Sequence, residues 1–161
     1  MSTINLNWAQ CMNNLEYLDL PKIPDYLLVD IYQTIRNTSA ADRHSNKEGT
    51  DAEKNAAWNS IKASDKLKEF VATLFQEEHD VHIFVLSADL PMHKDNTRDV
   101  AYNYVLETGA AVTNFHNEDE VVVEAHEIKQ FSWHKLNVSN YHSVSIPNGP
   151  RVVVSVSIHW D

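Results

Sequence analysis

Glycine, cysteine and basic residues are scarce in this chain of 161 residues, and each shortage narrows the classes of protein to which it can belong. Three glycines are too few for the glycine-rich phosphate loop of parallel-sheet nucleotide-binding folds. A single cysteine, Cys11, excludes an intrachain disulfide and a thiolate-rich metal site. The chain has 13 basic and 23 acidic residues, and its net charge of −10 argues against nucleic acid or an anionic membrane as the main partner.

Long apolar runs are also missing. No stretch approaches the ~18 apolar residues of a membrane span. The first residues lack the basic region and apolar core of a signal peptide. We therefore expect a cytoplasmic protein without a membrane segment. Hydrophobic residues make up 43% of the chain, which is ordinary for a globular protein, and the length is sufficient for one domain with a core.

The chain divides into two regions of different character within one expected domain, 1–161. Residues 1–80 look mainly helical and residues 81–161 mainly like strands. DYLLVDIYQTIRN begins at Asp25, which can cap a helix, and its apolar residues recur at helical spacing, as do those of SDKLKEFVATLFQEEH. The polar segment 38–50 predicts an exposed loop.

The second region contains short runs of β-branched and aromatic residues separated by polar turns. Many short strands at short intervals predict a sandwich or barrel. Helices followed by antiparallel strands predict an all-β core with N-terminal helices (α+β), in which the helices pack on one face of a jelly-roll. The predicted strands are VHIFVLSA, DVAYNYVLET, AAVTNFHN, EVVVEAHEI, FSWHKLNV, NYHSVSI and RVVVSVSIHW.

The segment LPMHKDNTR places His93 and Asp95 two residues apart, where an apolar strand ends. A strand directs residues i and i+2 to the same face, so the imidazole and the carboxylate could converge on one ion. His142, in SNYHSVS, is the candidate third ligand, since three or four short strands would span the separation. Two histidines and one carboxylate leave three positions open on an octahedral metal, which suits Fe(II) that binds a cosubstrate and O₂ together.

Arg151 follows His142 by nine residues and begins an otherwise apolar strand. An arginine entering a β-barrel is costly unless it meets an anion. Its planar guanidinium matches a carboxylate in bidentate geometry. A dicarboxylic acid that chelates iron at one end and reaches Arg151 at the other would account for both features.

Together, His93-x-Asp95, His142 in YHSV and Arg151 in PRVVVSVSIHW resemble the signature of the Fe(II)- and 2-oxoglutarate-dependent dioxygenases. The small prolyl-hydroxylase-like type, which includes bacteriophage examples, is most similar, and the resemblance covers roughly residues 80–161. It implies a double-stranded β-helix, a cupin-like jelly-roll. It also implies that the first three residues bind Fe(II) and that Arg151 binds the distal carboxylate of 2-oxoglutarate. A phage-encoded member would work in the host cytoplasm.

The same resemblance implies that Asn103 and Ser155 face the cosubstrate. Ser155 lies four residues beyond Arg151, so strand parity places both on one face. Tyr102 and Tyr104 have the opposite parity to Asn103. The chain therefore departs from many relatives in lacking a tyrosine that faces the cosubstrate.

The implied activity is hydroxylation of a C–H bond with consumption of O₂ and release of succinate and CO₂. A peptidyl residue such as proline is the first expectation for the substrate, and a free amino acid or other small molecule is the second. The net charge makes a nucleic-acid base the least favoured. Two alternatives stay open: a jelly-roll binding or structural protein without turnover, and a cupin-type metalloenzyme that uses no 2-oxoglutarate. The H-x-H pair typical of cupins is absent.

Other polar residues have simpler interpretations. Arg98 follows the H-x-D turn and could line the substrate mouth or form a surface ion pair with Asp95 or Asp99. His134 and His159 lie on strand-like segments, where an exposed or hydrogen-bonded histidine is favoured over a ligand. His79 and His82 straddle a predicted helix-to-strand junction without an obvious third ligand for zinc, and Thr113 and Phe115 could wall the pocket.

Overall fold

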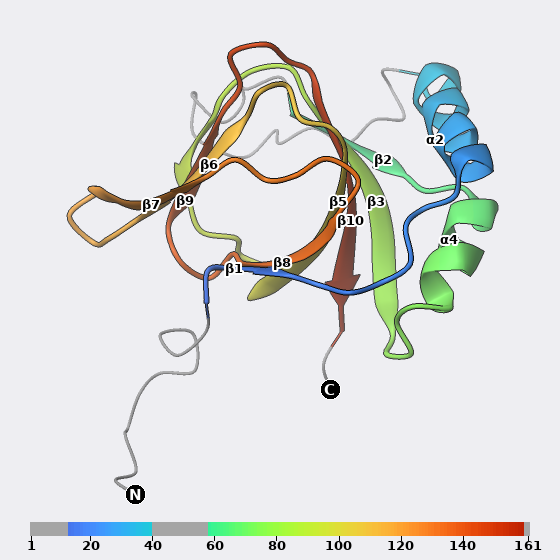
Figure 1. The fold of residues 1–161 in the computed structure, drawn as a ribbon, viewed down its shortest axis with the longest axis horizontal. Helices are drawn as coiled ribbons and strands as arrows, with labels where there is room; N and C mark the ends of the chain where they lie inside the picture. The colour runs from blue at the N-terminus through green and yellow to red at the C-terminus, as the bar shows by residue number, and fades with distance from the viewer. Residues whose placement is uncertain (1–12, 40–57, 160–161) are drawn as a thin grey trace, which may run out of the picture.

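A double-stranded β-helix with two helices on one side forms the core of the computed structural model, which describes residues 13–39 and 58–159 (Figure 1). The strands make a six-stranded sheet of order β1-β8-β5-β10-β3-β2 and a four-stranded sheet of order β4-β9-β6-β7. All their pairings are antiparallel. From β3 onward the chain passes repeatedly between the two sheets, which confirms the predicted jelly-roll. The strands are β1 (Leu15–Tyr17), β2 (Trp58–Lys62), β3 (His79–Leu86), β4 (Leu90–His93), β5 (Val100–Glu107), β6 (Val112–His116), β7 (Val122–His126), β8 (Trp133–Asn137), β9 (His142–Ser145) and β10 (Arg151–Ile158).

The first helix, α2 (Asp25–Asn37), has the bounds of the predicted segment. Its cap differs from the prediction, since Pro24 is the N-cap residue and no side chain caps the helix. Asp25 instead lies in the first turn, where its negative charge interacts favourably with the positive end of the helix dipole. The fully buried Leu27 and Ile31 form the face that packs on the larger sheet.

The second helix, α4 (Asp65–Ala72), is shorter than predicted because the chain turns after Ala72 and enters β3. Ser64 caps it, its Oγ accepting a hydrogen bond from the backbone N–H of Leu67 at 3.2 Å. The helix buries Leu67 and Val71 against the same sheet face as α2. None of the described helices has the length and apolarity that crossing a membrane requires.

The N-terminal half is less purely helical than predicted. It also supplies β1 and β2, which form the two edges of the larger sheet. Both segments are too short to reveal a strand period in the sequence, so their strand state depends on pairing with β8 and β3. The loop expected over 38–50 lies outside the described residues apart from 38 and 39.

The larger sheet has an apolar outer face and a mixed inner face. The outer face packs against the helices and contains Tyr104 and Trp133, each 1% exposed. Tyr102 packs against the same cluster, as strand parity predicted. The inner face looks toward the smaller sheet and carries Asn103 and Arg151 into the space between the sheets. The polar residues of the β-helix are therefore gathered inside it, opposite the helices.

Candidate active site

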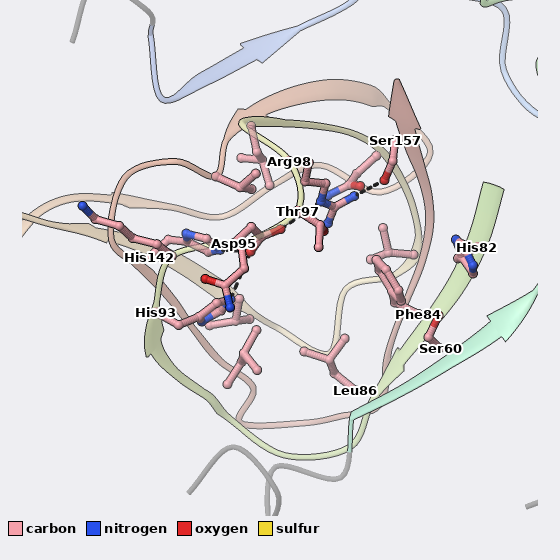
Figure 2. Close-up of a pocket in the computed structure, with 18 of the residues that line it drawn as sticks. Ser60, His82, Phe84, Leu86, His93, Asp95, Thr97, Arg98, His142 and Ser157 are labelled. Carbon is pink, nitrogen blue, oxygen red and sulfur yellow. Dashed lines mark hydrogen bonds and ion pairs between the residues drawn. The ribbon is translucent and has the colours of Figure 1, made fainter. Parts of the chain in front are cut away.

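Strand pairing brings the three predicted metal ligands together. His93 ends β4 and lies directly opposite His142, the first residue of β9. Asp95 follows β4 by two residues, and its backbone N–H donates to the carbonyl oxygen of Val138 at 3.0 Å, which fixes the turn. Asp95 Oδ1 lies 3.3 Å from the Nε2 atom of each histidine. Figure 2 shows the three side chains pointing toward one another at one side of the pocket.

Both imidazole rings are held with Nε2 directed at the shared point. His93 Nδ1 is 2.8 Å from the carbonyl oxygen of Pro91, and His142 Nδ1 is 2.8 Å from that of Asn140. Because a carbonyl only accepts, Nδ1 carries a proton in each ring, which leaves Nε2 as the atom that a metal would bind. Ligand atoms ~2.1 Å from an ion and at right angles to one another lie ~3.0 Å apart. The two His–Asp separations of 3.3 Å are close to this value, so the three side chains could bind one ion together.

Arg98 fixes the orientation of the Asp95 carboxylate. Arg98 Nε donates to Asp95 Oδ2 at 2.8 Å, which leaves Oδ1 toward the histidines. Burial raises the pKa of Asp95, but hydrogen bonds with His142 and His93 and the charge of Arg98 outweigh burial and hold that pKa well below its usual range. The predicted ion pair with Asp95 is confirmed, but it is mostly buried, since the Arg98 side chain is 15% exposed. Arg98 also lines the pocket, while its role toward a substrate stays a prediction.

A cavity of about 690 Å³ extends from the ligands between the two sheets, and Arg151 lines it. The Arg151 guanidinium is 5% exposed, and its Nη1 donates to Thr113 Oγ1 at 3.3 Å. No carboxylate pairs with it among residues 13–39 and 58–159. Burial lowers the pKa of Arg151 to about 10, so the group remains a cation at neutral pH.

Three buried polar atoms in this region have no hydrogen-bond partner among the described residues: Asn103 Oδ1, His134 Nε2 and Arg151 Nε. Asn103 and His134 lie opposite each other on β5 and β8. Burial and the charge of Arg151 lower the pKa of His134 to about 3, although a hydrogen bond with the Ser132 carbonyl acts against this shift, so the ring is neutral. Unpaired buried polar atoms are rare in folded proteins, and grouped ones indicate a site for a polar ligand.

One outcome differs from the residue-level expectations, and another agrees with them. His134 was expected to be exposed or fully hydrogen-bonded, yet it is fully buried with Nε2 unpartnered within the described part of the chain. Its shared parity with Leu136 on β8 was the available signal, but only the pairing with β5 shows that this face looks inward. Ser155 lies on the expected face, where its Oγ accepts a hydrogen bond from Arg98 Nη1 at 2.8 Å.

Comparison with protein-family models and with curated protein sequences found no match. Comparison with solved structures found a prolyl-4-hydroxylase from Pseudomonas putida, with a TM-score of 0.62 and 12% sequence identity over 92% of this chain and 93% of the other. It also found the non-heme α-ketoglutarate-dependent epimerase SnoN from nogalamycin biosynthesis, with a TM-score of 0.55 and 9% identity over 84% of this chain and 75% of the other. At these identities the likeness shows a shared fold, the double-stranded β-helix of such oxygenases.

Proposed function

We propose that the chain is an Fe(II)- and 2-oxoglutarate-dependent dioxygenase that hydroxylates a C–H bond, in the first instance of a peptidyl residue such as proline, with consumption of O₂ and release of succinate and CO₂. One observation carries this proposal: the same cavity holds a facial His-Asp-His ligand set and a buried arginine without a carboxylate partner among the described residues. The shared fold with a prolyl-4-hydroxylase and an α-ketoglutarate-dependent epimerase supports it.

The ligand set suits ferrous iron. Two imidazoles and one carboxylate on one face are the donors of non-heme Fe(II) oxygenases and leave positions open for other ligands. When bound, Fe(II) supplies the redox chemistry that couples O₂ to the cosubstrate and to the C–H bond. His93, Asp95 and His142 hold the ion. Arg98 keeps Asp95 Oδ1 directed at it, and hydrogen bonds of this kind outside the ligand shell strongly affect metal affinity.

The buried end of the cavity suits the distal carboxylate of 2-oxoglutarate. An uncompensated buried guanidinium costs several kcal/mol, so Arg151 requires an anion. Its fork of N–H donors can hold a carboxylate through two parallel hydrogen bonds. Thr113 orients the guanidinium, and Asn103, whose side-chain oxygen has no partner among the described residues, lines the same cavity.

The proposal is tested by adding Fe(II), then 2-oxoglutarate, to the protein without O₂ and recording the visible metal-to-ligand charge-transfer band. We expect a band for the wild type, its loss in His93→Ala, and a weaker band at equal 2-oxoglutarate in Arg151→Ala. A Ser155→Ala titration tests the cosubstrate role that the resemblance implies for Ser155. His116→Ala is the control, since His116 bonds Ser143 rather than the ligand set.

Two results would contradict the proposal. Iron uptake without a band would indicate a cupin-type metalloenzyme that uses no 2-oxoglutarate. No iron uptake by the folded protein would indicate a binding or structural jelly-roll. Succinate formation on admission of O₂ is the second readout, and it must depend on both Fe(II) and His142.

A further inference from the structure

A second cavity, of about 420 Å³, adjoins the active-site cavity. We call it the lysine cavity, after Lys62 and Lys68 in its wall. Asp80 and His82, on the first half of β3, line both cavities and join them. Lys62 ends β2 and lies directly opposite His82, whereas Lys68 comes from α4. The cavity therefore forms where the edge of the larger sheet meets the helix.

The lining of the lysine cavity contains two ammonium groups and one carboxylate, that of Asp80. Neither Lys62 nor Lys68 forms an ion pair within residues 13–39 and 58–159, although acidic residues outnumber basic ones by 23 to 13 in the whole chain. The carboxylate in the wall, Asp80, is engaged by His159, with Oδ2 and Nε2 2.6 Å apart. Burial lowers the pKa of His82; Asp80 opposes this shift, and the charges of Arg98, Lys62 and Lys68 add to it.

We propose that the lysine cavity binds an acidic side chain of a peptide whose hydroxylated residue lies at the metal ligands. This inference rests on the proposed function and names its substrate class, an acidic peptide rather than a free amino acid. The carboxylate of the peptide would lie between the ammonium groups of Lys62 and Lys68. The peptide backbone would then run through the active-site cavity past β3 and β10.

The separation between the lysines and the metal ligands favours an extended ligand over a small metabolite. Arg98 bridges Asp95 to Ser157 on β10, with Nη1 3.1 Å from Ser157 Oγ, and Ser157 lies opposite Asp80 on β3. Lys62 lies one strand further, on β2. Strands ~4.8 Å apart, together with the Arg98 bridge, give a path on the order of 15–20 Å from the ligands to the lysines, which is the upper limit of their separation. An extended peptide rises ~3.3 Å per residue, so about five residues cover this distance.

The surface between the metal ligands and the lysine cavity suits an extended peptide that carries a flat ring. His82 and Phe84 present parallel rings, with centroids 6.3 Å apart and an angle of 5° between their planes. The guanidinium carbon of Arg98 lies 5.7 Å from the Phe84 ring centroid. Figure 2 places His82 and Phe84 across the pocket from His93, Asp95 and His142. A nucleic acid is a poorer fit, since its phosphates call for a row of cations and the whole chain carries a charge of −10.

Peptide binding to the full chain, loaded with Fe(II) and 2-oxoglutarate without O₂, tests the inference. The probes are fluorescent synthetic peptides with one proline and one glutamate separated by one to about eight residues, with the glutamate either before or after the proline. A matched set has glutamine in place of glutamate. We expect the tightest binding at a separation of about five residues. Replacing the glutamate with glutamine should weaken that binding about fivefold, the scale of one or two exposed ion pairs, and salt should reduce the difference.

Charge-matched variants locate the effect. Lys62→Gln/Lys68→Gln should abolish the preference for glutamate, while Lys22→Gln/Lys66→Gln should keep it, because Lys22 and Lys66 are exposed but line neither cavity. The inference is overturned if no peptide gains from glutamate or if the preference survives in the first variant. It is also overturned if single-stranded DNA displaces every peptide and loses affinity in that variant. A normal charge-transfer band beside any of these results leaves the proposed function standing, whereas absence of the band contradicts the proposed function itself.

Discussion

The buried imidazole of His134 should make the stability of the protein depend on pH in a way that one substitution removes. The ring is fully buried, and burial together with the charge of Arg151 lowers its pKa from 6.5 to about 3. A base with a lowered pKa in the folded state binds its proton more readily when unfolded. Its contribution to stability is therefore complete above pH 6.5 and declines as the pH falls from 6.5 toward 3. From these two pKa values, proton linkage lowers the free energy of unfolding by ~2 kcal/mol at pH 5 relative to pH 8.

Urea unfolding of the wild type and of His134→Gln at pH 8 and pH 5 measures this contribution. Glutamine is neutral at both values, so every other titrating group contributes equally to the two proteins and cancels in the difference. We expect the free energy of unfolding of the wild type to fall by ~2 kcal/mol more than that of the variant between these pH values. Equal losses, to within about 0.5 kcal/mol, would refute the conclusion that His134 is buried as a neutral ring beside Arg151.

Three further substitutions test separate parts of the structure. Arg98→Ala removes the hydrogen bond to Asp95 Oδ2 and should weaken Fe(II) binding ~10- to 100-fold in an anaerobic titration; unchanged affinity would mean that Asp95 needs no such support. Thr113→Val removes the hydroxyl that contacts Arg151 and should raise the Kd for 2-oxoglutarate about fivefold with unchanged Fe(II) affinity; a loss of iron instead would place Thr113 in the wrong part of the site. Leu27→Ala should lower the free energy of unfolding by ~2–5 kcal/mol in urea, since the side chain is fully buried, and a change below about 1 kcal/mol would contradict the packing of α2 on the sheet.

The proximity of two of the three candidate metal ligands could be predicted because it is local. His93 and Asp95 lie two residues apart beside a strand, so their proximity needs no knowledge of the fold. His142 and Arg151 could be added because their spacing matched a known pattern. The same resemblance gave the inward direction of Asn103, which shares a cavity with Arg151. Strand parity gave the outward direction of Tyr102 and Tyr104, and the alternation of side chains along one strand carried that information.

His134 and the lysine cavity could not be predicted in the same way, since they depend on which strands pair. Strand parity shows which residues of β8 share a face with His134, but not whether that face points to the interior. The pairing of β8 with β5 decides this. Lys62 and Lys68 are separated by the start of α4, and nothing in their spacing indicates a shared cavity. They meet because β2 adds to the edge of β3 and α4 packs beside both. Such residues require the tertiary structure, whatever their chemical type.

Arg98 shows how one side chain can both form an ion pair and line a pocket, which looked like alternatives in the sequence. A guanidinium has five N–H donors in a rigid plane, so it can hold a carboxylate with one edge and other acceptors with another. Here Nε binds Asp95, Nη1 binds Ser155 and Ser157, and the plane lies near Phe84. The orientation of a metal ligand is thereby tied to the strand surface along which we place the peptide. A peptide that displaced Arg98 from Asp95 would weaken the metal site, so productive binding requires the peptide to pass beside Arg98 with this contact intact.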